Sequence, residues 1–177
     1  MEGRIEPVDQ EYIRHYWAAH WGLPVVSIDR VYQPEDVSGL VWRDEWGEAQ
    51  GLITWAIDGD SAEIVSVDAF QQGRHIGGRL LDGAEAELRR RKVRRATIVT
   101  TNDNLRALAF YVRRGYRIVR VALDDMDRVR ELKPGVPKLG SDNIPLRDMI
   151  QLEKDLTEAP SGGSRRIPES ARPETFA

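Results

Sequence analysis

Residues 67–81 of the chain run Val67-Asp68-Ala69-Phe70-Gln71-Gln72-Gly73-Arg74-His75-Ile76-Gly77-Gly78-Arg79-Leu80-Leu81. The stretch passes from a β-branched strand through a glycine-containing loop into the start of a helix. Small residues let backbone N–H groups converge, and the first turn of a helix adds the positive end of its dipole. The segment therefore predicts a cradle for a phosphate or pyrophosphate, to which Arg74 adds charge, although a plain strand-to-helix turn has the same outline.

The glycine spacing of this loop excludes two common nucleotide-binding motifs. It matches neither the G-x-G-x-x-G dinucleotide fingerprint nor the G-x-x-x-x-G-K-[ST] phosphate loop. The predicted phosphate or pyrophosphate cradle therefore belongs to neither of these two motifs.

The elements around the loop predict a mixed α/β domain. Apolar periodicity indicates helices between Asp9 and Gly22 and over residues 77–92, 104–114 and 124–132. Strands are expected over 37–42, 51–57, 62–69, 95–101, 116–123 and 150–156, with a hairpin turn at 58–60. We expect one domain over residues 1–157 and, from its composition, a disordered tail over residues 158–177.

The composition excludes several kinds of chemistry. The chain of 177 residues has no cysteine and a net charge of −3, so disulfides, thiolate metal sites and thiol nucleophiles are ruled out. Its three histidines are scattered, which predicts no metal site. No apolar run is long enough for a membrane helix and the start lacks the layout of a signal peptide, so we expect a cytoplasmic protein without membrane partners. The slightly acidic total argues against nucleic-acid binding, and the basic run over 89–95 is typical of an exposed helix end.

Two motifs carry a family resemblance. Gln72-x-x-His75-x-Gly77 resembles the Q/R-x-x-G-x-G/A coenzyme A loop of the GNAT superfamily of N-acetyltransferases, with His75 where a glycine is usual. Residues 104–116, NLRALAFYVRRGY, resemble the N-x-x-A-x-x-F-Y-x-x-x-G-F/Y signature that follows it in that superfamily. The resemblance covers about residues 5–156. Stretches at 63–65, 100–104, 133–134, 144–148 and 152–154 also look like a bacterial subgroup of these enzymes.

The resemblance implies a fold and a reaction. The fold would be a central mixed, mostly antiparallel sheet of six or seven strands flanked by helices, with a splay that binds coenzyme A. The reaction would pass acetyl directly from acetyl-CoA to a primary amine of a small molecule, in a ternary complex without an acyl-enzyme. Acetylation of a protein amine and a non-catalytic acyl-CoA sensor are the alternatives, and the chain would be a monomer or homodimer.

The same resemblance assigns roles to individual residues. The coenzyme would be held by Val67, Asp68, Ala69, Gln72, Gly73, Arg74, His75, Ile76, Gly77, Gly78, Asn104, Ala107 and Tyr111. Tyr111 would also protonate the leaving thiolate, since phenol and thiol pKa values lie within about two units. Asn104 can at the same time be a plain helix N-cap.

The general base is less sharply indicated. Glu63 is preferred, with Asp68 or a water chain as alternatives. In a regular strand Glu63 and Asp68 point to opposite faces, so only one can face the site unless a bulge intervenes. Walls of the acceptor pocket are expected from Tyr16, Trp17, Trp21, Tyr32, Trp42 and Trp46. Trp46, beside Asp44 and Glu45, would suit a cationic amine.

Overall fold

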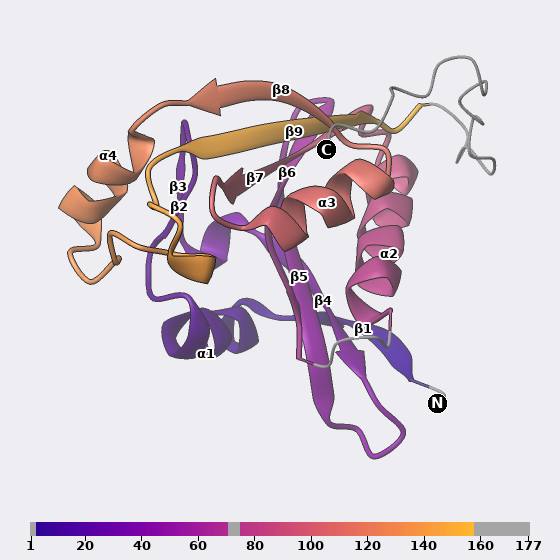
Figure 1. The fold of residues 1–177 in the computed structure, drawn as a ribbon. Coiled ribbons are helices and arrows are strands. Elements are labelled where there is room, and N and C mark those ends of the chain that lie inside the picture. Colours follow the sequence, from indigo (N-terminus) through magenta and orange to yellow (C-terminus); the bar gives the residue numbers. More distant parts are fainter. Residues whose placement is uncertain (1–2, 71–74, 158–177) are drawn as a thin grey trace, which may run out of the picture.

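The computed structural model describes residues 3–70 and 75–157, and its centre is a seven-stranded sheet in the order β1-β4-β5-β6-β7-β9-β8 (Figure 1). The strands are β1 (Arg4–Val8), β4 (Ser38–Arg43), β5 (Ala49–Asp58), β6 (Ser61–Ala69), β7 (Arg95–Thr101), β8 (Arg117–Ala122) and β9 (Met149–Asp155). Among the described strands only β6 and β7 pair in parallel. The predicted mixed, mostly antiparallel sheet is confirmed.

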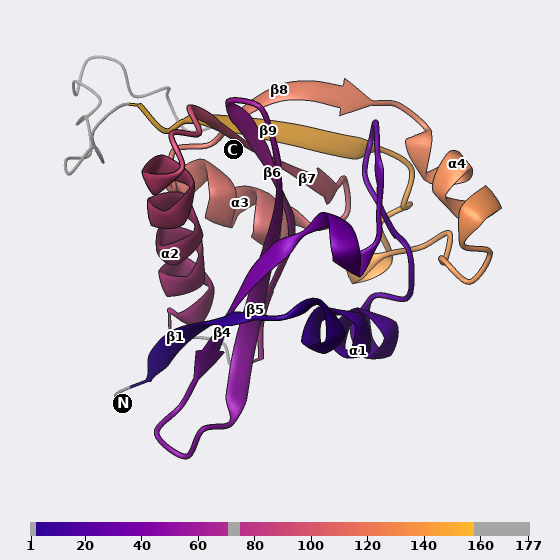
Figure 2. The ribbon, with the colours of Figure 1, turned by 180° about the vertical axis from the view of Figure 1, so that it is seen from behind.

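Helices cover both faces of this sheet (Figure 2). They are α1 (Gln10–His20), α2 (Ile76–Arg90), α3 (Leu105–Arg113) and α4 (Asp125–Leu132). Apolar residues of α2 and α3 share one core with the sheet, around Leu80, Leu81 and Tyr111. On the other face, α1 and the small hairpin of β2 (Val25–Val26) and β3 (Val31–Tyr32) form a second core around Trp17. A third core joins α4 to the beginning of β9.

The helix ends follow the expected capping chemistry. The Asp9 carboxylate accepts a hydrogen bond from the Tyr12 amide at 2.8 Å, as an N-cap residue does. After α3, Gly115 adopts a φ of +89°, and the Tyr116 amide bonds the Tyr111 carbonyl at 3.1 Å. This C-terminal motif needs a left-handed residue, which explains the glycine.

One bulge decides which way the side chains of β6 point. Thr54 pairs with Ser66 and Trp55 pairs with Ile64, so Val65 is an extra residue in β6. An extra residue reverses the alternation of faces beyond it. Glu63 and Asp68 therefore lie on the same face of the sheet, the face of α1, although a regular strand would have separated them.

The sheet splays at the same point. β6 pairs with β7 only from Ser61↔Arg95 to Ile64↔Ile98, and the pairing stops where the bulge begins. Beyond it β7 pairs with β9 up to Thr101↔Met149, while the β7-facing edge of β6 pairs with no described strand. The predicted splay is thus placed between residues 65–69 of β6 and the end of β7.

Three features of the fold were not expected from the sequence. The edge strand β1 and the β2–β3 hairpin are short and carry weak periodicity. The boundaries of the other elements differ from the expected ones by at most two residues.

The expected tail, residues 158–177, lies outside the described residues. No described helix combines the length and apolarity that crossing a membrane requires.

Candidate functional site

Three elements meet at the first turn of α2, beside the splay. A Cβ placed on Gly77 would lie 3.8 Å from the Ala69 Cβ at the end of β6 and 3.9 Å from the Phe110 ring of α3. These are ordinary contact distances, so the packing of the described protein alone does not require a glycine there. The described residues thus leave room for a methyl group at Gly77, and a glycine there keeps the backbone accessible to a ligand that approaches closely.

The same turn presents backbone donors that have no acceptor within the helix. The first intrahelical bond of α2 runs from the Arg79 amide to the His75 carbonyl at 3.0 Å. The N–H groups of Ile76, Gly77 and Gly78 precede it and have no intrahelical acceptor. An anion such as a phosphate fits these donors and the helix dipole.

His75 occupies a backbone conformation that favours glycine. Its φ is +57° and its ψ is 16°, the left-handed region, and it is the N-cap residue of α2. Histidine is tolerated there better than a β-branched residue, at some cost in strain. The histidine thus keeps the backbone path of the glycine that the resemblance leads one to expect.

Three predicted coenzyme residues, Gln72, Gly73 and Arg74, lie outside the described residues. A cation that the sequence reasoning missed lies nearby. Arg114 packs so close to Gly78 that a Cβ on this glycine would collide with its guanidinium, and it pairs with Asp82 at 2.7 Å. Arg114 stands at a variable position of the second motif, so the pattern alone did not single it out.

Tyr111 extends from α3 into the core beside the splay and is 7% exposed. Burial, and secondarily the charge of Asp68, raise the pKa of its phenol. The phenol is therefore protonated at neutral pH, and it is a weaker acid than an exposed tyrosine. Asp68 lies on the opposite face of the sheet from Tyr111, at the level where β6 and β7 are not paired with each other. Its negative charge acts on the phenol from there.

Asn104 and Ala107 lie in the first turn of α3. The Ala107 amide donates to the Asn104 side-chain oxygen at 3.1 Å, so Asn104 is an N-cap. The cap leaves the Asn104 side-chain amino group free for a second partner.

Glu63 lies on the α1 face, under the β2–β3 hairpin. It accepts hydrogen bonds from the hydroxyls of Ser27 and Tyr32, the latter at 2.9 Å. Burial raises the pKa of the Glu63 carboxyl, against the lowering effect of these two bonds. A small cavity of about 170 Å³, which Thr97 and Gln151 also line, adjoins it.

Asp68 is the second carboxylate of this face. It accepts a hydrogen bond from the Trp21 indole N–H at 2.6 Å and another from Tyr16. Burial raises the pKa of its carboxyl as well. Beside it the rings of Tyr16, His20 and Phe70 stack, with centroids 4.4 Å apart for Tyr16–His20 and 5.8 Å for Tyr16–Phe70. A carboxylate among partly exposed aromatic rings suits a cationic ligand.

The six aromatic residues expected around an acceptor are only partly brought together. Besides Tyr16, Trp21 and Tyr32, Trp17 reaches this face, where its indole N–H donates to the Ser66 hydroxyl at 3.2 Å. Trp42 instead belongs to the core on the α2 face.

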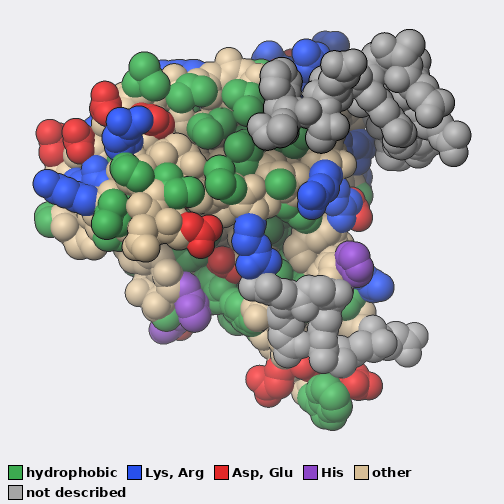
Figure 3. Space-filling view, viewed as in Figure 1, with side chains coloured by type: hydrophobic (Ala, Val, Ile, Leu, Met, Phe, Trp, Pro, Cys, Tyr) green, Lys and Arg blue, Asp and Glu red, His purple; other side chains and the backbone are tan. Residues whose placement is uncertain are grey.

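The expectation for Trp46 is wrong. It is 72% exposed and lies in the turn between β4 and β5. Figure 3 shows hydrophobic and acidic side chains together at the end of the molecule where this turn projects. The Asp44 carboxylate is not available to an amine, because it accepts bonds from the Trp46 and Glu48 amides and from the side chain of Gln50. The hydrogen bonds of Asp44 therefore stabilise the turn in which Trp46 lies.

The loop over residues 133–147 borders the same face as the two carboxylates. The Lys133 ammonium bonds the Trp21 carbonyl at 2.7 Å, which ties this loop to the end of α1. The Asp103 carboxylate accepts from the Ser141 amide at 2.8 Å. The Asn102 side chain accepts from the Arg147 and Asp148 amides. The loop is thus anchored to both α1 and the end of β7.

Comparisons with known proteins agree with this geometry. A model of the acetyltransferase (GNAT) family matches residues 7–116. The uncharacterised protein YxbD of Bacillus subtilis (strain 168) is 35% identical over 150 residues, 84% of this chain and 94% of that protein. YdhI of the same organism is 33% identical over 148 residues, 83% of this chain and 92% of that protein.

Solved structures share the fold. An IAA acetyltransferase from Bacillus cereus ATCC 14579 superimposes with a TM-score of 0.72 at 22% identity, covering 87% of this chain and 99% of that one. A GNAT family acetyltransferase from Elizabethkingia anophelis with acetyl-CoA bound gives a TM-score of 0.63 at 18% identity, covering 86% and 97% of the two chains.

Proposed function

Because the chain belongs to the GNAT family of acetyltransferases, we propose that it transfers the acetyl group of acetyl-CoA directly to a primary amine of a small molecule. The observation that carries this proposal is the meeting of three features at one opening. These are the edge of β6 that pairs with no described strand, the first N–H groups of α2, which have no acceptor within the helix, and the protonated phenol of Tyr111.

The coenzyme is proposed to lie across the splay. Its pyrophosphate would meet the N–H groups of residues 76–78, with Arg114 close by. Its pantetheine arm would pair with the backbone of Val67 and Ala69, as an additional strand would. The small residue at Gly77 and the edge of β6 that pairs with no described strand both fit a ligand of this shape and charge.

Glu63 is proposed as the proton acceptor. The attacking amine must lose a proton, and a carboxyl with a raised pKa is a better base than an ordinary one. As the amine forms its bond to the thioester carbonyl carbon, the electron pair of the C–S bond leaves on sulfur. Tyr111 then donates its phenolic proton to the thiolate and later regains one from solvent.

Asp68 is proposed to hold the ammonium form of the acceptor before reaction. It shares the face of Glu63 and is bordered by Tyr16, Trp21 and Phe70, which leaves a negative charge beside apolar surface. The two carboxylates then have separate duties. Replacing Glu63 by Gln would lower kcat and change its pH profile, whereas Asp68→Asn would chiefly raise the KM of the amine.

The proposal is tested by release of coenzyme A from acetyl-CoA with a panel of polyamines, aminoglycosides, amino acids and lysine peptides. Tyr111→Phe should lower kcat by about 10²–10⁴-fold, the usual value of general acid catalysis, and leave acetyl-CoA affinity nearly unchanged. Tyr12→Phe, the same change on α1, is the matched control. An unchanged kcat in Tyr111→Phe would remove this phenol from the mechanism.

Binding is tested separately from turnover. Gly77→Leu would fill the space above the first turn of α2 and should abolish the rise in melting temperature that acetyl-CoA causes. Intact binding would refute the placement of the coenzyme. If acetyl-CoA stabilises the natural protein but no amine is turned over, the chain is an acyl-CoA sensor. Turnover of peptides alone would make it a protein acetyltransferase.

A further inference from the structure

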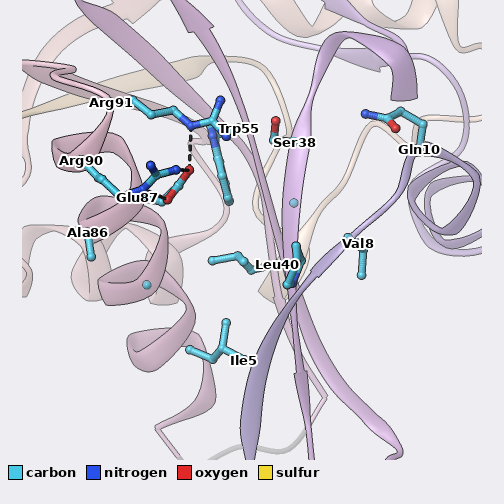
Figure 4. A pocket seen from close by; sticks show the side chains of 13 residues that line it. Ile5, Val8, Gln10, Ser38, Leu40, Trp55, Ala86, Glu87, Arg90 and Arg91 are labelled. Carbon is cyan, nitrogen blue, oxygen red and sulfur yellow. Dashed lines mark hydrogen bonds and ion pairs between the residues drawn. The ribbon is translucent and has the colours of Figure 1, made fainter.

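A second cavity lies between the C-terminal half of α2 and strands β1 and β4. It has a volume of about 630 Å³, in the range of small-molecule sites. Figure 4 shows Ile5 and Leu40 reaching from the strands toward α2, with Trp55 at the other end of the gap. The proposed coenzyme site uses the first turn of α2, whereas this cavity lies along its last two turns.

The sequence of α2 leaves this space open. At Gly83 the helix touches the sheet, because a Cβ there would lie 3.3 Å from the Ile5 Cδ1 and 3.4 Å from the Leu40 Cδ1. One turn later the lining positions are Ala86, which is small, and Glu87, which is charged. No large apolar side chain follows Gly83 on this side of α2, so the apolar walls formed by Ile5 and Leu40 face an unfilled gap.

The indole of Trp55 lacks a hydrogen-bond partner in this cavity. Trp55 is 2% exposed, and its Nε1 bonds to no described residue. The indoles of Trp17 and Trp21 are, by contrast, both bonded. A buried N–H without an acceptor is costly, because it has lost its bond to water. Trp55 lines the cavity, but its Nε1 is itself buried, so the ring has to shift before an acceptor atom of a ligand in the cavity can restore that bond.

The mouth of the cavity carries excess positive charge. Arg90 and Arg91 share a single carboxylate, that of Glu87, with contacts of 2.7 Å. Their side chains remain 70% and 47% exposed, so each guanidinium has donors left over. A second carboxylate could be bound by these donors without displacing Glu87.

We propose that this cavity is a second ligand site, for a small carboxylate with an apolar body. The apolar part would lie between Ile5, Leu40 and Ala86, and the carboxylate at Arg90 and Arg91, with one of its oxygens toward the Trp55 indole. The site is independent of the proposed acetyl transfer, since it shares no side chain with the splay.

The experiment follows the indole N–H resonances of the full chain by ¹H–¹⁵N NMR during titration with octanoate. Trp55→Phe assigns the Trp55 signal by its disappearance. We expect a saturable shift of that signal in the millimolar range or below. No shift of this signal, or an equal shift with octylamine in place of octanoate, would overturn the proposal.

Two variants that retain Trp55 localise the binding. Ala86→Leu should fill the gap and abolish the octanoate shift, while the acetyl-CoA-induced rise in melting temperature persists. Arg91→Gln should weaken octanoate binding about tenfold, the loss of one charge-assisted bond. Arg106→Gln, an exposed arginine on α3, is the matched control and should bind octanoate normally. Unaltered binding in Ala86→Leu would place octanoate elsewhere and refute the site.

Discussion

At the scale of single residues, the raised pKa of the Glu63 carboxyl bears both on its proposed role as a base and on the stability of the protein. Burial raises its pKa above the usual 4.5 in the folded chain. The folded state then binds the Glu63 proton more tightly than the unfolded state does. The contribution of Glu63 to stability is therefore fully present below pH 4.5 and is lost as the pH rises through its raised folded pKa.

Glu63→Gln should consequently stabilise the protein at neutral pH, by roughly 0.5–2 kcal/mol, the usual range for a stabilising replacement. The gain should vanish as the pH falls toward 4.5, because Glu63 is then neutral as well. Urea unfolding at a series of pH values measures it. Glu45→Gln, at the exposed β4–β5 turn, is the control and should show no such trend. A destabilised Glu63→Gln at pH 7.5 would contradict the prediction.

His75 gives the second prediction at this scale. Its left-handed conformation costs a non-glycine residue about 1 kcal/mol or more, so His75→Gly should raise the free energy of unfolding by about that amount. His75→Ala removes the same side chain but keeps the strain, and should give no gain. Equal stabilisation in both variants would show that the side chain, not the backbone, was responsible. Denaturant unfolding of the three proteins decides between them.

At the scale of elements, the sequence predicted regular segments well and irregularities poorly. The helix face of Leu80 and Leu81 and the caps at Asp9 and Gly115 were readable, because each depends on local spacing. The bulge at Val65 was not readable, since its side chain fits a regular strand equally well. It nevertheless decides that Glu63 and Asp68 share a face. Short strands such as β1 acquire their structure from the neighbour they pair with.

The β4–β5 turn and the end of α1 give a paired prediction. Trp46→Ala should change neither the melting temperature nor the KM for the best amine of the panel, because Trp46 projects into solvent. Trp21→Phe keeps an aromatic ring but removes the indole donor to Asp68. It should raise the amine KM about tenfold or more, the usual value of one hydrogen bond to a charged group. Steady-state kinetics of both variants measure this, and the reverse pattern would return Trp46 to the site.

At the scale of the whole molecule, the sheet separates two kinds of surface. On the α1 face lie the carboxylates and aromatic rings proposed for the acceptor. On the α2 face lie the helix N-terminus proposed for the coenzyme. At the splay β6 and β7 are not paired with each other. There the charge of Asp68, on one face, acts on Tyr111, on the other, and raises the pKa of its phenol. The composition was enough to exclude thiol chemistry. The arrangement of the two faces could not be predicted in this way, because it depends on pairing between strands that are distant in the sequence.

The last prediction concerns how much of the chain the fold needs. β9 lies inside the sheet, between β7 and β8. The Leu156 amide bonds the Arg94 carbonyl at 2.7 Å, and the Leu156 carbonyl accepts from Arg89 at 3.1 Å. A chain ending at Thr157 keeps all of these contacts and should match the melting temperature and acetyl-CoA affinity of residues 1–177. A chain ending at Asp148 loses β9 and should fail to fold, by circular dichroism. A large loss of stability in the chain that ends at Thr157 would show that residues 158–177 belong to the folded domain.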